Sequence, residues 1–368
     1  MDKLLKALKE NKKKVLIFGG IALLTIILLI ILIVILVNIF KRYDYNEIET
    51  IMVDETKSYL NRNSSLLPTE ENPLVTIEAS TLITEEYMKD FSKLSKDTNC
   101  TGSIDVVYNN GAYRYLPSLT CSNYTSTSLQ ETILQNEKIV LENAGLYELN
   151  DYYTYRGEYV NNYLNFANEN WRIVKFNDDQ IILVLSDTAN NMDPVVFDDR
   201  YNETLNSNRG YNTFESSRIE ETILDIYNNY FANYKNYLLT MDSCVHTRSE
   251  TDYNNTGAIE CYTTYQTPIS LLPAYDYINA SIDPLCQTVS TGNCTNYNYL
   301  AAASHDWWLL NGTNENTYDV YRVNNRGSIA LERASVKNYL RVVIAIPNNV
   351  LYSSGDGTKD NPYQIKVF

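Results

Sequence analysis

The sequence predicts an α+β protein with a single N-terminal transmembrane helix, a small disulfide-closed β-hairpin stalk domain and a larger mixed α+β head. Three observations predict this arrangement. A charge-free apolar run occupies residues 15–37, and an Asn-Gly turn lies midway between Cys100 and Cys121. After residue 146, short alternating strand-like segments accompany one strongly amphipathic helical segment.

The apolar run contains 23 consecutive uncharged residues, most of them Leu, Ile and Val. At 1.5 Å per residue it is long enough to cross a hydrocarbon core of about 30 Å. A cleaved signal has a shorter apolar region followed by small residues, whereas residues 34–40 are bulky. A buried core helix of this length would show a polar stripe. We therefore expect an uncleaved signal-anchor, with a transmembrane helix over residues 15–40.

The charges on either side of this run predict its orientation. Residues 1–14 carry six Lys against Asp2 and Glu10, so we expect this segment to be a cytoplasmic tail and the rest to be extracellular, on a single-pass protein of the cell membrane. Residues 1–42 carry a net charge of +6 within an overall −15, which leaves −21 on the exported part. Such acidity argues against nucleic-acid binding, and against docking on anionic lipids or wall polymers by charge alone.

The six cysteines all follow the apolar run, and none has the CxxC spacing of a zinc or redox site. Their even number in an exported chain predicts disulfides. A turn signal lies inside each consecutive pair, so of the fifteen possible connectivities we expect consecutive pairing. The predicted bridges are Cys100–Cys121, Cys244–Cys261 and Cys286–Cys294.

The stalk domain is expected over residues 41–127. Asn-Gly between two strand-like segments is the strongest short hairpin signal, and closing this hairpin would bring Cys100 opposite Cys121. The predicted elements are a helix over 43–62 that ends before Pro68, a short helix over 84–94 capped by Thr84, and hairpin strands over 103–108 and 112–119.

A polar connector over residues 128–145, helical as far as 143, leads to the head, residues 146–368. Ser217 and Glu220 have the spacing of a capping box, and the apolar residues that follow share one helical face, which we expect to pack on a sheet rather than to bind a partner. That face contains Ile219, Ile223, Ile226, Tyr230 and Phe231. The predicted strands cover residues 152–156, 159–166, 171–176, 181–186, 318–323, 328–331 and 340–345.

Short motifs in the head occur in a characteristic order. They are Asn170-Trp171-Arg172-Ile173-Val174, Leu185-Ser186-Asp187, Asp306-Trp307-Trp308-Leu309-Leu310, Val323-Asn324-Asn325-Arg326-Gly327 and Leu340-Arg341-Val342. This order resembles an uncharacterised family of surface proteins from low-GC Gram-positive bacteria, with W-R-V, S-D, W-W-L-R-S, V-N-x-x-G and V-R-P motifs. That family is similar to the formylglycine-generating-enzyme version of the C-type-lectin-like fold. The resemblance implies a small twisted sheet with long loops over residues 146–350.

The chain departs from the family pattern at two places. Leu310 and Asn311 stand where the family has Arg and Ser, and Val342 stands where it has Pro. Any ligand contact made by the family's Arg is therefore not carried over. The stalk domain faintly resembles pilin-like exported domains, although it lacks their processed leader and their early Glu.

The most promising binding residues surround the Trp pair. Adjacent residues on a strand point to opposite faces, so one of Trp307 and Trp308 could fill the core while the other reaches the surface. A surface Trp beside polar side chains would suit a sugar or a peptide. The candidate ligand-binding residues are Trp307, Trp308, Arg322, Asn324, Asn325, Arg326 and Arg341. The alternative is that both Trp are buried and that Arg341 satisfies an internal carboxylate.

Catalytic and metal signals are weak. His246 and His305 lack the spacing of a zinc site and an obvious nucleophile partner, and phosphate-binding Gly-rich loops are absent. Acidic pairs at 198–199 and at 356 and 360 could hold Ca²⁺, but solvated turn acids are the simpler interpretation, so no cofactor is expected.

These features predict a membrane-anchored surface protein that binds an extracellular glycan, peptide or surface protein and that is not an enzyme. Two alternatives stay open. One is an exported enzyme of unknown chemistry, and the other is a structural subunit of a pilus-like assembly.

Overall fold

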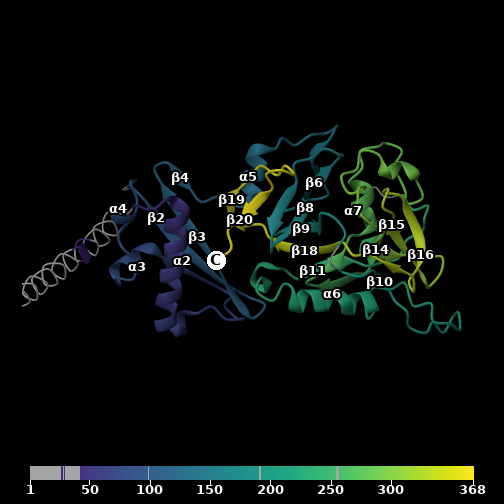
Figure 1. The fold of residues 1–368 in the computed structure, drawn as a ribbon, viewed down its shortest axis with the longest axis horizontal. Coiled ribbons are helices and arrows are strands. Elements are labelled where there is room, and N and C mark those ends of the chain that lie inside the picture. Colours follow the sequence, from purple (N-terminus) through teal and green to yellow (C-terminus); the bar gives the residue numbers. More distant parts are fainter. Residues whose placement is uncertain (1–25, 28, 30–41, 98, 190–191, 254–256) are drawn as a thin grey trace, which may run out of the picture. The chain divides into compact units, whose positions relative to one another are not determined.

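The structure is a computed structural model that describes residues 26, 27, 29, 42–97, 99–189, 192–253 and 257–368 (Figure 1). The predicted cytoplasmic tail and most of the predicted transmembrane helix lie outside the described residues. Among the described residues, no helix is both long enough and apolar enough to cross a membrane. The chain divides into two compact units: the first contains Met1–Ser65, Thr76–Ile104 and Pro117–Thr125, and the second contains Leu66–Val75, Asp105–Leu116 and Ser126–Phe368.

The predicted domain boundary at residue 127 lies next to the division between the units at residue 125. The end of the predicted hairpin, residues 105–116, belongs to the second unit. The side-chain amides of Asn109 and Asn110 there donate hydrogen bonds to the carbonyl oxygen of Leu238, each at 3.0 Å. The predicted connector also belongs to the second unit, where helix α5 (Leu129–Asn136) begins at a capping box of Ser128 and Glu131.

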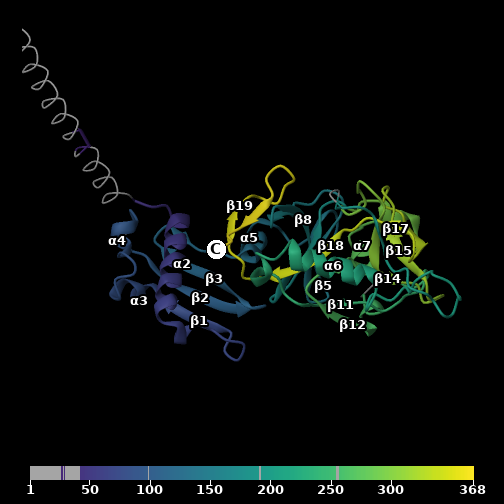
Figure 2. The ribbon, with the colours of Figure 1, turned by 60° about the horizontal axis from the view of Figure 1, so that its bottom comes forward.

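Helix α2 (Tyr45–Arg62) covers the predicted 43–62 segment. Its first turn is closed by a capping box, in which Asp44 accepts from the backbone of Glu47 and the Glu47 side chain accepts from the backbone of Asp44. The helix lies across the sheet of the first unit (Figure 2). A Cβ at Gly102, in that sheet, would lie 2.6 Å from the terminal methyl of Met52, so glycine permits the close approach of α2.

The sheet beside α2 has the strand order β1-β2-β3-β4. Its central strands form the predicted hairpin around Asn110 and Gly111, both of which have positive φ, as an Asn-Gly turn requires. The Cys100–Cys121 disulfide closes the hairpin, as predicted. The strands are β1 (Leu74–Glu78), β2 (Thr101–Asn109), β3 (Ala112–Cys121) and β4 (Tyr124–Thr125).

The prediction of a single helix over residues 84–94 is wrong. Two short helices occupy this region instead, α3 (Ala79–Thr84) and α4 (Phe91–Leu94). Between them Glu86 has φ +60, a left-handed conformation through which an α-helix cannot continue. The cap expected from Thr84 is supplied by Asp90, whose carboxylate accepts from the backbone of Ser92 at 2.9 Å.

The second unit is built on a nine-stranded sheet with the order β13-β18-β9-β8-β7-β20-β19, from which β6 and β5 branch at β8. Antiparallel pairing dominates, and the β20–β7 pair is parallel. The predicted 159–166 strand is confirmed only from Tyr163, because Asn162 turns its side chain to the carbonyl of Ile173. The strands are β5 (Gly145–Leu149), β6 (Tyr152–Arg156), β7 (Tyr163–Phe166), β8 (Glu169–Phe176), β9 (Gln180–Leu185), β13 (Ser270–Leu271), β18 (Val342–Pro347), β19 (Tyr352–Ser354) and β20 (Tyr363–Ile365).

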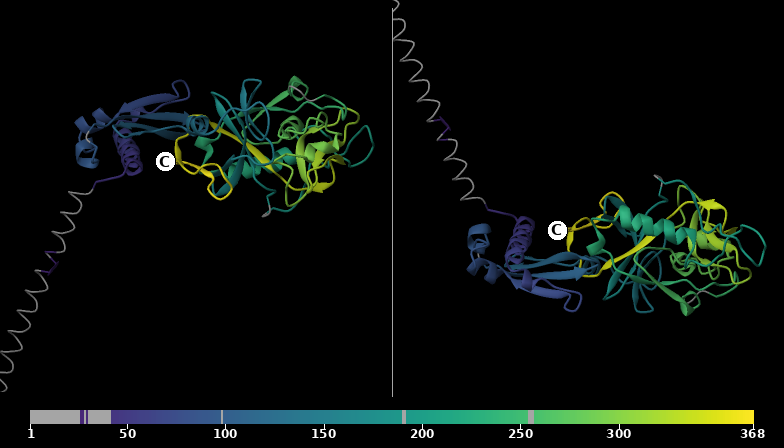
Figure 3. Two further views of the ribbon diagram at one scale, coloured as in Figure 1. Left: turned by 90° about the horizontal axis from the view of Figure 1, so that it is seen from above. Right: turned by 90° about the horizontal axis from the view of Figure 1, so that it is seen from below.

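Helix α6 (Arg218–Asn229) runs along one side of the second unit (Figure 3). Ser217 caps it as predicted, but the Glu220 carboxylate bonds to the backbone of Ser216, so the capping box is incomplete. The predicted apolar face packs on the sheet in part: Ile219 and Ile223 are buried, whereas Tyr230 is 46% exposed. The ring centre of Phe231, just after the helix, lies 6.1 Å from that of Trp171 of β8.

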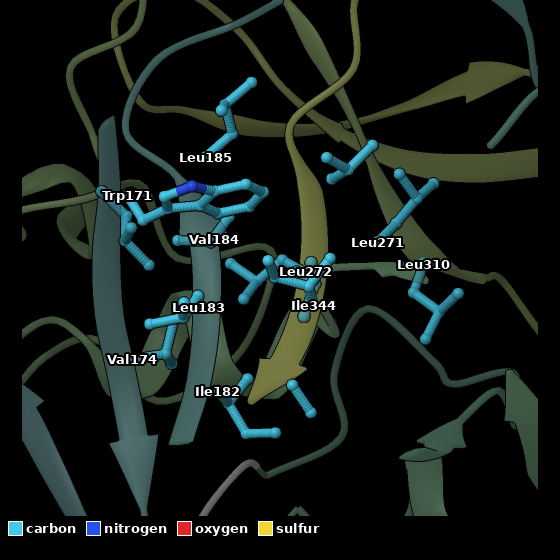
Figure 4. Close-up of a cluster of buried hydrophobic side chains, with 14 of the residues drawn as sticks. Trp171, Val174, Ile182, Leu183, Val184, Leu185, Leu271, Leu272, Leu310 and Ile344 are labelled. Atoms are coloured by element: carbon cyan, nitrogen blue, oxygen red, sulfur yellow. The ribbon is translucent and has the colours of Figure 1, made fainter. Parts of the chain in front are cut away.

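The core of the second unit lies between these elements. The indole of Trp171 lies across β9 near Val184 (Figure 4). Ile344 lies on β18, the strand that pairs with the other edge of β9. All of these side chains are buried because β8, β9 and β18 are central strands that are covered on both faces.

Smaller sheets and two further disulfides complete the second unit. Cys244 pairs with Cys261 and Cys286 with Cys294, so all three predicted bridges are confirmed, and the mixture of helices and sheets confirms the α+β class. The remaining elements of the second unit are β10 (Val195–Val196) with β17 (Lys337–Asn338), β11 (Met241–Cys244) with β12 (Thr264–Thr267), the sheet of β14 (Trp307–Gly312), β15 (Asp319–Val323) and β16 (Ile329–Arg333), helix α7 (Ala274–Asn279), and 3-10 turns at Lys235–Tyr237, Glu260–Tyr262 and Gly292–Thr295. A further 3-10 turn, Ser64–Leu66, contains the point where the chain passes from the first unit to the second.

Candidate functional site

The Trp pair of β14 lies in the core, and both side chains are 0% exposed. Trp307 packs edge-on against Tyr277, and Trp308 packs edge-on against Phe197 while its indole N–H donates to the carbonyl of Val195 at 3.0 Å. The two residues point to opposite faces, as a strand requires, but all six residues of β14 are buried, so neither face meets solvent. The expectation that one Trp reaches the surface is therefore wrong.

Arg341 is fully buried beneath Trp307, with its guanidinium carbon 4.6 Å from the ring centre. It donates to the carbonyl oxygens of Leu185, Leu300 and Ser186 at 3.0, 2.9 and 3.1 Å. The alternative prediction gave Arg341 an internal carboxylate as its partner, but its hydrogen-bond partners are three backbone carbonyl oxygens. Burial lowers the pKa of Arg341 to about 10, and Asp187 partly opposes this effect. Arg341 therefore stabilises the fold.

The other four predicted residues belong to β15 and the turn that follows it. Arg322 donates to the carboxylate of Asp306 at 2.6 Å, and the same carboxylate accepts from the backbone of Asn325 at 2.9 Å. Asn324 accepts from the backbones of Arg326 and Ser328, which closes the turn. Arg322, Asn324, Asn325 and Arg326 thus lie together, but the buried Trp pair and Arg341 do not join them at a surface.

Cavities lie elsewhere in the second unit. None of the three described below is lined by any of the seven predicted residues. One of about 210 Å³ surrounds Lys175 and Asp276, one of about 540 Å³ lies beside Trp171 and Tyr230, and one of about 820 Å³ lies between the chain around Tyr159 and the chain around Tyr297.

The largest of these cavities, which we call the tyrosine hollow, has four tyrosines in its lining. Its residues are Glu158, Tyr159, Val160, Asn161, Tyr163, Arg172, Thr295, Asn296, Tyr297, Asn298, Tyr299, Ala301, Ala302 and Lys359. Tyr159 is 84% exposed and Tyr297 is 59% exposed. Single exposed aromatic residues are common, but two that come from distant segments and line one cavity form a surface suited to a ligand.

Arg172 fixes the floor of the tyrosine hollow. Its guanidinium carbon lies 3.8 Å from the ring centre of Tyr163 and 4.8 Å from that of Tyr299, and its Nε donates to the side chain of Asn162 at 2.6 Å. Burial lowers the pKa of Arg172. Because the cation contacts both rings, it holds them in fixed positions.

The rim and the polar groups of the hollow are also held in place. Tyr297 has φ +47, in the left-handed region that an aromatic residue rarely adopts, and it follows closely on the disulfide-bonded Cys294. Tyr299 is nine-tenths buried, and its hydroxyl has no hydrogen-bond partner among the described residues. The hollow therefore offers two exposed rings to a ligand, above a floor that Arg172 holds in place.

The two histidines do not complete a hydrolytic triad with Ser304. The Ser304 hydroxyl donates to the carboxylate of Asp187, whereas His305 Nδ1 lies 3.1 Å from the hydroxyl of Thr188 and its ring stacks on Tyr339. His246 contacts Thr263 and Tyr262.

Asp198 and Asp356, which the sequence offers as Ca²⁺ ligands, accept hydrogen bonds from neighbouring residues instead. Asp198 is buried and accepts from Arg200 at 2.9 Å and from the backbone of Tyr211 at 2.8 Å. Asp356 accepts from the backbone and the hydroxyl of Thr358. These carboxylates fix the local chain.

Comparison with protein-family models, with curated proteins and with solved structures finds no match for this chain. The sequence motifs had drawn attention to Arg172 but not to Tyr159 or Tyr297, because the abundance of tyrosine, 32 in the chain, hides any individual one.

Proposed function

We propose that this chain is a membrane-anchored, extracytoplasmic binding protein that recognises a neutral glycan at the tyrosine hollow. The proposal keeps the class of function expected from the sequence but moves the site from the Trp pair to Tyr159, Tyr163, Tyr297 and Tyr299. The observation that carries it is the pair of exposed rings, 84% and 59% accessible, that line one cavity of about 820 Å³.

The chemistry of the hollow suits a sugar better than a purely apolar ligand. A sugar ring has an apolar face of C–H groups that can stack on an aromatic ring, and hydroxyls that bond to side-chain amides and phenols. Asn161 and Asn296, which line the hollow, supply side-chain amides. The net charge of −21 outside residues 1–42 disfavours an anionic polymer.

The membrane anchor and the finer fold are part of the same proposal. The charge-free run over residues 15–37 and the basic residues before it support a single-pass anchor with an extracellular head. The three disulfides suit an oxidising compartment. The order of short motifs supports a C-type-lectin-like head, in which loops on a sheet carry recognition.

The test is a glycan and wall-fragment array probed with the full chain in a detergent without a sugar head group. Tyr159→Ala and Tyr297→Ala each remove one exposed ring, so we expect each to lower affinity by about 1–3 kcal/mol while the melting temperature changes little. Tyr262→Ala is the matched control, because Tyr262 is 75% exposed and does not line the hollow.

Two results would contradict the proposal. The first is that the wild type binds no glycan on the array. The second is that both hollow variants bind as tightly as the Tyr262→Ala control.

A further inference from the structure

Helix α6, strands β8, β9 and β18 and the segment that follows β9 contribute to the cavity of about 540 Å³. We call it the acidic cavity, because its lining contains Glu169 and Asp187 but no Lys, Arg or His. The linings of the other two cavities each contain carboxylates together with cations. The acidic cavity shares no lining residue with the tyrosine hollow, so this site is independent of the proposed glycan site.

The two acidic residues lie at opposite positions of neighbouring strands. Trp171 of β8 pairs with Leu185 of β9, and the backbone hydrogen bond between the next residues of the two strands continues this register. One residue further on, Glu169 lies across from Asp187, on the face that Trp171 and Leu185 share. Like charges directly opposite each other on neighbouring strands repel. A cation between them would relieve this repulsion.

The fold itself supplies no such cation. Neither Glu169 nor Asp187 forms an ion pair with a Lys, Arg or His in the described part of the chain. Arg341 attracts Asp187 from within the core, but its N–H groups donate to three backbone carbonyl oxygens. Glu169 Oε1 accepts from the hydroxyl of Tyr230 at 2.9 Å, which leaves Oε2 for a ligand.

The wall beside the carboxylates is apolar. From α6 and its end come Ile226, which is half-buried, and Tyr230, which is 46% exposed, while Trp171 and Leu185 are buried below them. Burial and the charge of Glu169 raise the pKa of Tyr230 to about 12, so the phenol keeps its proton and stays uncharged. An occupant must therefore combine a positive charge with an apolar body.

We propose that the acidic cavity binds a small organic ammonium ion with an apolar body. The ammonium group donates to Glu169 and Asp187, and the body packs against Ile226 and Tyr230. The sign of the charge follows from the two like charges that face each other, and N–H bonds to carboxylates are among the strongest hydrogen bonds. A bare metal ion would leave the apolar wall uncovered, whereas a volume of about 540 Å³ is typical of sites for small molecules.

Equilibrium dialysis of the full chain, in micelles of an uncharged detergent, tests the proposal, with protein-free micelles as the blank. Phenethylamine and hexylamine each carry an ammonium group on an apolar body. Three further probes lack one feature each: phenylethanol is neutral, hydrocinnamate is anionic, and methylamine has no apolar body. We expect at least one of the first two probes to bind more tightly than all three others, and its binding to weaken as salt is raised.

Glu169→Gln removes one negative charge but keeps an oxygen that can accept from Tyr230, and it should fold because Glu169 is only half-buried. We expect it to weaken binding of the amine about tenfold, as the loss of one charge-assisted hydrogen bond does. Asp225→Asn is the matched control, because it removes one negative charge from an exposed position of α6 outside the cavity. Asp225→Asn should leave binding unchanged, and so should Tyr159→Ala in the tyrosine hollow.

Three results would overturn the inference. Neither amine binds above the micelle blank, phenylethanol or methylamine binds as tightly as the amines with an apolar body, or Glu169→Gln binds the amine as tightly as Asp225→Asn does. Weaker binding in Tyr159→Ala but not in Glu169→Gln would place the amine in the tyrosine hollow and would also overturn it.

Discussion

Buried and half-buried cations do much to organise the second unit at the scale of single residues. Lys175 and Arg248 each pair with a buried carboxylate, whereas Arg172 and Arg341 use neutral acceptors and aromatic rings. A guanidinium spreads its charge over a planar group with five N–H donors, so it tolerates such surroundings better than an ammonium does. This difference explains why the buried cations that are hydrogen-bonded to neutral acceptors, Arg114, Arg172 and Arg341, are all arginines.

Replacing Arg341 by Met tests its structural role. The variant keeps an apolar stem under Trp307 but removes three hydrogen bonds from buried carbonyl oxygens. We expect the free energy of unfolding to fall by about 3 kcal/mol, measured by urea titration. Arg326→Met is the control, because Arg326 is exposed, and it should change stability by less than about 0.5 kcal/mol. Equal effects of the two substitutions would contradict this role.

Asp187 should make stability depend on pH. Burial alone would raise its pKa, but hydrogen bonds from Ser304 and Thr188 outweigh burial and lower the pKa below the ordinary 3.8. Because the folded state takes up this proton at a lower pH than the unfolded chain, Asp187 stabilises the fold above about pH 3.8, and this contribution is lost as the pH falls through its folded pKa.

The corresponding variant is Asp187→Asn. We expect it to lower the free energy of unfolding more at about pH 6 than at about pH 3, as measured by urea titration at both values. Asp225→Asn, on the exposed side of α6, is the control. If Asp187→Asn and Asp225→Asn show the same dependence on pH, the hydrogen bonds of Asp187 do not have this effect.

At the scale of elements, disulfides anchor the loop-rich part of the second unit. Cys244, at the end of β11, joins Cys261 in the 3-10 turn Glu260–Tyr262, and both half-cystines line the cavity of about 210 Å³ around Lys175 and Asp276. The bridge therefore closes the segment between the paired strands β11 and β12. Short loops of this kind have little core of their own, so a covalent link contributes much of their order.

Removing this bridge with Cys244→Ser and Cys261→Ser together should lower the free energy of unfolding by about 2–4 kcal/mol, chiefly because the unfolded chain gains freedom. Urea titration of the double variant beside the wild type measures it. Addition of reductant should bring the wild type down to or below the variant. A double variant as stable as the oxidised wild type would show that the loop is held by its other contacts.

The whole molecule combines a basic segment over residues 1–14 with an acidic remainder after residue 42. The first unit has the long helix α2 and the short helices α3 and α4 beside its sheet, and the second has a nine-stranded sheet with its own core. The second unit contains the tyrosine hollow that we propose as a binding site. The first unit is stabilised by its own disulfide and by the packing of α2.

The proposed topology can be tested on intact cells. Because Lys-rich residues precede the apolar run, we expect a protease added to protoplasts to remove the part of the chain after residue 42 and to leave a tag at residue 1 protected. Protoplasts opened with detergent serve as the control, in which the tag should also be lost. Protection of the C-terminal part in intact protoplasts would reverse the topology.

Much of the fold could be predicted because its signals are local. The Asn-Gly hairpin, α2, α6 and the three disulfides depend on residues separated by at most 21 positions. Backbone preferences, caps and turn residues act over such distances, so the sequence carries them directly. The wrong prediction of one helix over residues 84–94 shows where such local signals end. The left-handed conformation of Glu86 interrupts the helix, and the spacing of apolar residues does not predict that conformation.

The identity of the site was decided only by the tertiary structure. The sequence determined that Trp307 and Trp308 lie on a strand, but elements distant along the chain, among them Phe197 and Tyr277, cover both of its faces. In the same way, Tyr159 and Tyr297 are separated by more than a hundred residues and meet at one cavity. Exposure of a side chain depends on which distant segments pack over it, and local sequence preferences do not carry that information.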